Sequence, residues 1–158
     1  DVAAQAGIPI ILTHNQKTRN YESLLPEVIA SLSESVTVAI NAGVRESNII
    51  LDPGIGFGKT PDHNLEILRR LEEFKDLGYP LLVGTSRKST IRLALELGAD
   101  SQTNDASQGL LQGTAATVAL AIASGADIVR VHDVKEMLSV CKMSDAVVRS
   151  WRPSSWKR

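Results

Sequence analysis

The sequence predicts an α/β fold built from parallel (β/α) units, and two patterns support this class. Short apolar runs at residues 8–12, 49–51, 81–83 and 128–131 alternate with longer amphipathic or alanine-rich segments. The runs are continuously apolar, which is typical of strands in a parallel sheet that helices cover. Four such units form either half of an eight-unit (β/α)8 barrel, which needs about 250 residues, or a small open doubly wound sheet.

The chain opens with the end of a helix at residues 2–6, which Gly7 closes at a position that favours a left-handed residue. The first strand, at 8–12, follows and ends in a polar stretch at 13–15. A chain that starts inside a helix agrees with the half-barrel alternative, in which the amino-terminal half is not part of this sequence.

Two amphipathic helices are predicted on either side of the second strand. The first ends at Gly43 and has an apolar residue every four positions, namely Leu24, Val28, Leu32, Val36 and Ile40. The second begins at Asp62 and ends near Gly78. Its predicted inward-facing residues are Leu65, Leu68, Leu71 and Phe74.

The third strand is followed by two predicted helices. Ser86 is placed to cap a helix that runs to Gly98. A polar loop at 100–108 then leads to an alanine-rich helix at 110–124.

After the fourth strand, Asp133 and Glu136 have the spacing of a capping box and predict the start of the last helix. The basic segment 150–158 has no periodicity and is predicted to be a loose tail. We expect the whole chain, 1–158, to form one domain, a partial barrel.

Composition excludes several classes of partner. The chain has 158 residues, 43% of them hydrophobic, and 17 basic against 18 acidic residues. A net charge of -1 provides no overall field for nucleic acid or an anionic membrane. No apolar run approaches the about 20 residues of a membrane span. The lone Cys141 offers no disulfide framework and fits a reducing, cytoplasmic setting.

A glycine-rich segment follows the second strand. Its glycines do not match the phosphate loop of nucleoside triphosphatases, because that pattern needs glycine at Pro53. They do not match the dinucleotide fingerprint either, because its third glycine falls on Lys59. The loop lets the backbone approach a flat ligand, and Asp52 can accept two hydrogen bonds from an amino-pyrimidine edge. The alternative is a tight turn that Asp52 caps.

Two further strand ends carry cationic side chains. Arg87 and Lys88 stand at a predicted helix start, where hydroxyls, amides and cations together favour an anion; the alternative is that both point into solvent. Arg130 and His132 are two residues apart and so share one face of the fourth strand, where they can bind phosphate. The alternative for Arg130 is an ion pair with a neighbouring aspartate.

Other histidines carry less information. His14 ends the first strand and is expected to be structural, and His63 is expected on the surface. The sequence contains no zinc-protease motif, no clustered cysteines and no nucleophile elbow, so those enzyme classes have no support.

Taken together, the segments 51–59, 83–89 and 128–134 resemble the dihydropteroate synthase family, and the resemblance runs over nearly the whole chain. It implies the carboxyl-terminal half of a pterin-binding (β/α)8 TIM barrel, that is, the last four units. It also implies an enzyme that condenses 7,8-dihydropterin-6-ylmethyl diphosphate with 4-aminobenzoate in folate biosynthesis, giving 7,8-dihydropteroate and diphosphate. Sulfonamides should compete as mimics of aminobenzoate.

The resemblance assigns roles to residues of this chain. Lys88 and Arg130 match the family's catalytic lysine and arginine. The residues that match substrate-binding positions are Asp52, Phe57, Lys59, Gly84, Lys88, Ser89, Arg130 and His132. Asp52 would hold the pterin, His132 the diphosphate, and Ser89 the aminobenzoate carboxylate.

Further expectations come from the family alone. Mg²⁺ is expected, with ligands in the absent amino-terminal half and none in this chain, and the complete protein is expected to be a homodimer. Two alternatives stay open: a methyltetrahydrofolate-dependent methyltransferase domain, which would not need an anion site at 86–89, and a pterin-binding fragment without activity.

Overall fold

The computed structural model describes residues 2–98 and 104–152. Its elements, in chain order, are α1 Val2–Ala6, β1 Ile10–Thr13, α2 Leu24–Asn41, η1 Glu46–Asn48, β2 Ile49–Asp52, α3 Pro61–Arg69, η2 Leu71–Leu77, β3 Leu82–Val83, α4 Ser89–Ala94, α5 Asn104–Ala123, β4 Ile128–Val129 and α6 Val134–Val148. None of these helices is long and apolar enough to cross a membrane.

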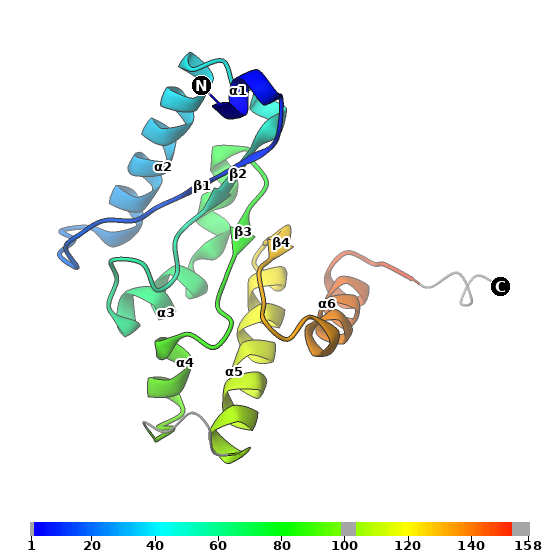
Figure 1. The fold of residues 1–158 in the computed structure, drawn as a ribbon. Coiled ribbons are helices and arrows are strands. Elements are labelled where there is room, and N and C mark those ends of the chain that lie inside the picture. The colour runs from blue at the N-terminus through cyan, green and yellow to red at the C-terminus, as the bar shows by residue number, and fades with distance from the viewer. Residues whose placement is uncertain (1, 99–103, 153–158) are drawn as a thin grey trace.

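The four strands lie side by side in chain order and all run parallel (Figure 1). β1 pairs with β2, so that Thr13 stands opposite Asp52 at the carboxyl end of both strands. A single parallel bridge joins Leu51 to the residue before β3, and β3 pairs with β4 in turn. The predicted parallel α/β class is therefore confirmed.

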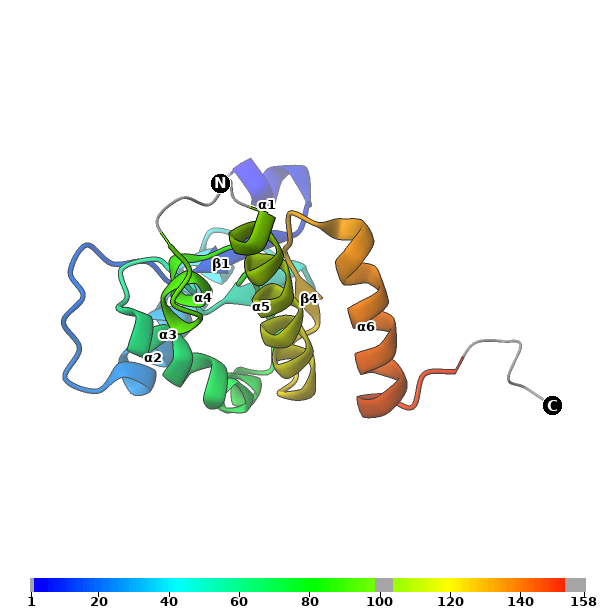
Figure 2. The ribbon, with the colours of Figure 1, turned by 90° about the horizontal axis from the view of Figure 1, so that it is seen from below.

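The helices cover the strands on one face, and the main core lies between the two layers. In Figure 2, α6 stands beside α5 at one edge of the molecule, and α2 and α3 lie at the other. Along β1, Ile10 and Leu12 pack against this core, whereas Ile11 is 46% exposed on the opposite face. Ile128 in β4 is also exposed. The strands therefore have a covered outer face and an inner face that is open at both ends of the sheet, as in half of a barrel.

Helix α2 follows the predicted pattern except at its end. Leu24, Val28, Leu32 and Val36 are buried, but Ile40 is 36% exposed and Ala39 is buried in its place. A spacing of four residues turns 400° around an α-helix, so a strict four-residue repeat drifts away from the core by about 40° at each step.

Helix α3 begins one residue before the predicted Asp62. The side chain of Thr60 accepts a hydrogen bond from the backbone N–H of His63, and the His63 ring accepts one from Thr60 in return. His63 is thus a half-buried capping residue and not a free surface histidine. Leu65 was expected to face the core but is 36% exposed, and Ile67 is buried instead.

The prediction of a helix that starts at Ser86 is wrong. Helix α4 covers only Ser89–Ala94, and Arg87 has a left-handed backbone, with a φ of 55°, that a helix cannot contain. The predicted loop at 100–108 is also wrong from 104 onward, because α5 begins at Asn104; positions 99–103 lie outside the described residues.

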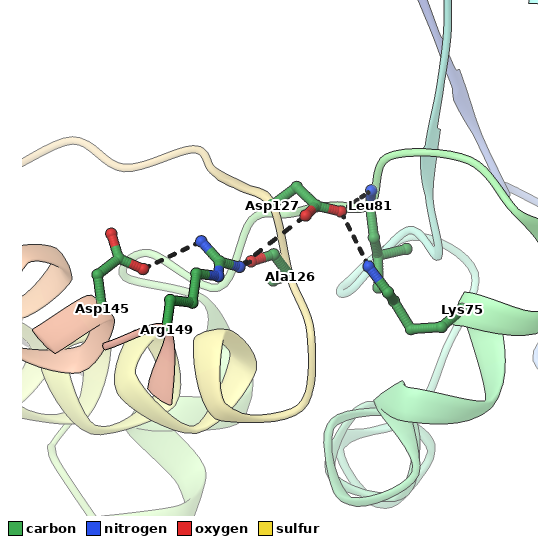
Figure 3. A network of polar contacts seen from close by, with 6 residues as sticks. All are labelled: Lys75, Leu81, Ala126, Asp127, Asp145 and Arg149. Carbon is green, nitrogen blue, oxygen red and sulfur yellow. Dashed lines mark hydrogen bonds and ion pairs between the residues drawn. The ribbon is translucent and has the colours of Figure 1, made fainter. Parts of the chain in front are cut away.

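At the amino ends of β3 and β4, Asp127 joins three parts of the chain (Figure 3). Its carboxylate accepts a hydrogen bond from the backbone N–H of Leu81, 3.0 Å away, and pairs with Lys75 at 3.3 Å. Arg149, after α6, lies 3.9 Å from the same carboxylate and also pairs with Asp145. The network ties α6 and η2 to the strands at the end opposite the candidate site. Of the predicted tail, residues 150–152 form no helix or strand, and 153–158 lie outside the described residues.

Candidate functional site

Asp52 lies at the carboxyl end of β2 and is almost fully buried. One carboxylate oxygen accepts a hydrogen bond from the backbone N–H of Gly54 at 2.8 Å. The other accepts one from the Thr13 hydroxyl at 3.3 Å and lies 3.8 Å from a guanidinium nitrogen of Arg130. The carboxylate is therefore oriented by its neighbours, and one of its oxygens faces the cationic side of the site.

Above these strand ends is a cavity of about 470 Å³. It is lined by Phe57, Gly84, Ser86, Lys88, Arg130, Val131 and His132. Loops from three different strands contribute these residues, which is where parallel α/β proteins place their ligands. A second, smaller cavity of about 160 Å³ lies between α3, α4 and α5. Because its lining is mostly aliphatic, the cavity at the strand ends, with Lys88, Arg130 and His132 in its lining, is the candidate site.

Lys88 forms one wall of the cavity. Its ammonium lies 4.2 Å from the centre of the Phe57 ring, a cation–π contact. Burial lowers the pKa of Lys88, the nearby Arg130 lowers it further, and Asp52 acts in the opposite direction. The ammonium is thus partly desolvated and held against an aromatic face, which strengthens its interaction with any anion or carbonyl that enters.

Gly84 leaves room for Arg130. A Cβ atom at this buried glycine would lie 3.4 Å from two nitrogens of the guanidinium, which lies against the glycine backbone. The Arg130 side chain itself is 55% exposed, so it can turn between Asp52 and a ligand in the cavity. A flat guanidinium with this freedom can bind an anion or stack on a flat ring.

His132 is placed by Ser86, a residue predicted as a helix cap. The Ser86 hydroxyl accepts a hydrogen bond from the His132 backbone N–H at 3.1 Å and lies 2.9 Å from Nδ1 of its ring. The neighbouring Arg87 does not face the cavity as a free cation, because it forms a two-pronged ion pair with Asp133. Hydrogen bonding to Asp133 raises the pKa of Arg87, and the same contact lowers the pKa of Asp133.

Lys59, which the resemblance places in the loop beside the aminobenzoate pocket, is not among the residues that line the cavity. Its ammonium is buried and lies 2.8 Å from Nδ1 of His14. Burial lowers the pKa of Lys59 to about 8. Burial and then the charge of Lys59 lower the pKa of His14 to about 4, so His14 is neutral at pH 7.

The glycine-rich loop and helix α4 are joined by Asn64, which is buried. Its side-chain oxygen accepts a hydrogen bond from the Gly56 backbone N–H at 2.8 Å. Its side-chain nitrogen donates to the Thr90 hydroxyl at 2.9 Å. Asn64 thus connects the loop that carries Phe57 to the helix that follows Lys88.

The structure brings most of the predicted site residues together: Asp52, Phe57, Gly84, Lys88, Arg130 and His132. Ser89 begins α4 and is exposed, outside the cavity lining. Sequence reasoning missed the positions of Thr13 and Ser86. Thr13 could have been found from its place at the end of the first strand, level with Asp52.

No group of three or more His, Cys, Asp or Glu side chains that could hold a metal ion occurs in the two described ranges. The chemistry of the cavity is that of an anion and heterocycle site: a buried carboxylate below, with an ammonium, a guanidinium and an imidazole around it.

These features define a class, a parallel (β/α) protein with a cation-lined cavity at the carboxyl ends of its strands. The comparison with protein families assigns the chain to one family within this class. Residues 1–132 match the model of the pterin binding enzymes, and the chain belongs to this family.

Relatives agree with this assignment. The chain is 50% identical over 147 residues to a dihydropteroate synthase of Bacillus subtilis, covering 93% of this chain and 49% of that protein. It is 42% identical to a Clostridium difficile dihydropteroate synthase crystallised in the presence of pteroic acid, with a TM-score of 0.86 over 94% of this chain and 54% of the other. A Xanthomonas albilineans dihydropteroate synthase with 4-aminobenzoic acid is 30% identical, with a TM-score of 0.84. The match covers 96% of this chain and 52% of the other.

The chain spans about half the length of the relatives that it matches. The resemblance to dihydropteroate synthase is therefore confirmed for this half. The half-barrel expectation agrees with the parallel strand order and with the structural neighbours.

Proposed function

We propose that this chain is the carboxyl-terminal half of a dihydropteroate synthase, which joins a dihydropterin methyl diphosphate to 4-aminobenzoate. The observation that carries the proposal is the buried Asp52 carboxylate beneath a rim formed by Lys88, Arg130 and His132. A pterin has an amino-pyrimidine edge that donates hydrogen bonds to a carboxylate, and its diphosphate needs cations nearby. The site offers both kinds of partner: cationic side chains line the cavity, and the Asp52 carboxylate lies beside Arg130.

The reaction needs positioning and charge more than a strong acid or base. The bond between the methylene carbon and the diphosphate oxygen breaks, and its electron pair leaves with the diphosphate. The arylamine nitrogen then forms a bond to that carbon and releases a proton. In this proposal Asp52 holds the ring, and Arg130 and His132 stabilise the departing anion. Lys88 and Phe57 border the ring and the incoming arylamine.

The remaining expectations about the complete protein are also proposals. Mg²⁺ would be held by residues outside this chain, as the family resemblance implies. A homodimer is supported by apolar side chains on the outer surfaces of α5 and α6, among them Leu120, Met143 and Val147. A cytoplasmic location is supported by the unpaired Cys141.

The test is product formation by this chain joined to the amino-terminal half of the Bacillus subtilis relative. Dihydropteroate should form from the pterin diphosphate and 4-aminobenzoate, and a sulfonamide should compete with aminobenzoate. Lys88→Ala and Arg130→Ala should each lower kcat/KM by about 100-fold, the usual cost of removing a group that stabilises developing charge. Lys142→Ala removes an exposed cation on α6 and should change little.

Two results would contradict the proposal. If Lys88→Ala and Arg130→Ala leave turnover intact in the joined protein, the assigned roles are wrong. If the joined protein folds and binds a pterin but makes no product, the chain is a pterin-binding fragment without activity.

A further inference from the structure

Lys59 has an unusual environment for a lysine. Its side chain is buried, and none of the ion pairs among residues 2–98 and 104–152 involves it. A buried ammonium without a carboxylate in contact costs free energy unless hydrogen bonds replace its hydration. Here the replacement comes from three acceptors: the ring of His14 at 2.8 Å and the backbone carbonyls of Gly54 and Phe57, each at 3.1 Å.

The loop between β2 and α3 bends around this ammonium. Gly54, Gly56 and Gly58 all have positive φ angles, which lets the chain turn tightly. The Gly54 carbonyl accepts a hydrogen bond from the Phe57 backbone N–H at 3.0 Å as well as from Lys59. The lysine therefore binds both ends of the turn that carries the Phe57 ring.

His14 holds the other side of the ammonium. A charged imidazole can only donate hydrogen bonds, so the 2.8 Å contact requires a neutral ring whose Nδ1 accepts from Lys59. The two loops also touch through their backbones, because a Cβ atom on Gly54 would lie 1.9 Å from the His14 carbonyl oxygen. His14 and the glycine-rich loop are thus packed as one unit.

We propose that Lys59 is a positioning residue that, with His14, fixes the glycine-rich loop so that the Phe57 ring supports Lys88, and that Lys59 does not contact substrate. The importance of the contact between Phe57 and Lys88 rests on the proposed function, in which both side chains border the substrates. The geometry of the loop itself is independent of that function.

The test uses nuclear magnetic resonance of the 158-residue chain without ligand. In Lys59→Met, hydrogen exchange of the Phe57 amide should speed up at least tenfold, while amides in the core of α2 change less than twofold. The Lys88 Cε protons, shifted upfield by the Phe57 ring in the parent chain, should return to ordinary values.

Variants of His14 separate this role from a general loss of stability. His14→Leu removes the acceptor and should reproduce the effects of Lys59→Met. His14→Asn keeps an oxygen near the position of Nδ1, so the exchange at Phe57 should stay within twofold of the parent chain. Faster exchange at Phe57 in His14→Asn than in His14→Leu would overturn the proposal. No change at Phe57 and Lys88 in any variant would also overturn it.

A measurement on the parent chain keeps the proposal falsifiable if a variant does not fold. The Nζ protons of Lys59 should exchange with water at least tenfold more slowly than those of the exposed Lys142, and equal rates would disprove the buried contact. If Lys59→Met instead weakens aminobenzoate binding while Phe57 and Lys88 keep their signals, Lys59 is a ligand contact and the inference is wrong. None of these readouts depends on turnover, so they stand apart from the condensation assay.

Discussion

Single residues at the strand ends have their conformation fixed by very close neighbours. Gly54 is the clearest case, since its φ is +73° and the His14 carbonyl occupies the space of a side chain. Gly78 has a similar φ of +79°, but nothing lies within 4 Å of the place that a Cβ atom would take. The two glycines therefore allow backbone strain to be separated from steric overlap.

We predict that Gly78→Ala lowers the free energy of unfolding by about 1 kcal/mol, the cost of a left-handed backbone for alanine. Gly54→Ala should cost about 3 kcal/mol or more, because backbone must also move away from the added methyl group. Urea unfolding of both variants checks this. Equal losses of unfolding free energy in the two variants would mean that the glycine-rich loop moves easily away from the His14 backbone.

The pKa of Lys88 should change when the neighbouring Asp52 is substituted. Asp52 raises the pKa of Lys88, against burial and Arg130, which lower it. We therefore predict that Asp52→Asn lowers the pKa of Lys88 further. Titration of ¹³C-labelled lysine by nuclear magnetic resonance measures this shift, with Lys142 as the internal reference. A rise would show that Asp52 does not act on this ammonium.

At the scale of elements, the sequence predicted the strands and the helices α2, α5 and α6 well, but the single helix predicted from Asp62 to Gly78 is divided into α3 and the 3-10 helix η2. Apolar runs located all four strands to within a few residues, because strands of a parallel sheet that helices cover are rich in apolar residues. It failed at 86–88, where the predicted helix start is a loop. The reason is tertiary: Ser86 binds His132 and Arg87 pairs with Asp133, and both partners are 46 residues away in the sequence.

In the candidate site, too, some features could be predicted from the sequence and others could not. The position of a residue at a strand end can be read from the sequence, so Asp52, Lys88 and Arg130 were found. The direction of a side chain within a loop cannot be read in this way: the sequence did not predict that the ammonium of Lys59 turns inward to His14. Periodicity contains no information about such contacts between loops.

The connection between elements at the opposite end depends on Asp127. We predict that Asp127→Ala lowers the free energy of unfolding by about 1–3 kcal/mol, because the Leu81 N–H loses its acceptor and Lys75 its partner. Asp145→Ala removes only an exposed pair with Arg149 within one helix turn and should cost about 0.5 kcal/mol or less. Thermal unfolding compares them. Similar costs would show that the Asp127 network does not join the elements.

For the whole molecule, acid stability should reflect the buried His14. Its pKa in the folded chain is about 4 against an ordinary value of 6.5, so folding favours the neutral ring. The resulting stability is complete above pH 6.5 and is lost as the pH falls through 6.5 toward 4. It amounts to at most about 3 kcal/mol, from the size of the pKa difference.

We predict that the unfolding free energy of the parent chain minus that of His14→Asn decreases as the pH falls from 6.5 to 4, because only the parent chain loses stability when His14 is protonated. Carboxylates are common to both proteins, so their titration largely cancels in the comparison. A difference that is constant over this range would show that His14 titrates normally.

The open inner face of the sheet gives a second prediction at this scale. Ile11 in β1 and Ile128 in β4 are exposed at the two edges, where a complete barrel would continue. Supplying the amino-terminal half of a relative should therefore slow hydrogen exchange of both strands. Hydrogen-exchange mass spectrometry checks this, and unchanged exchange at both edges would mean that the halves do not join through them.

Asn64 lies behind the ligand cavity, yet it holds the Gly56 backbone with one atom and Thr90 with another. The spacing between Phe57 and Lys88 is consequently governed in part by a buried side chain outside the cavity lining. Variation at Asn64 could therefore move one wall of the cavity without removing any group that lines it.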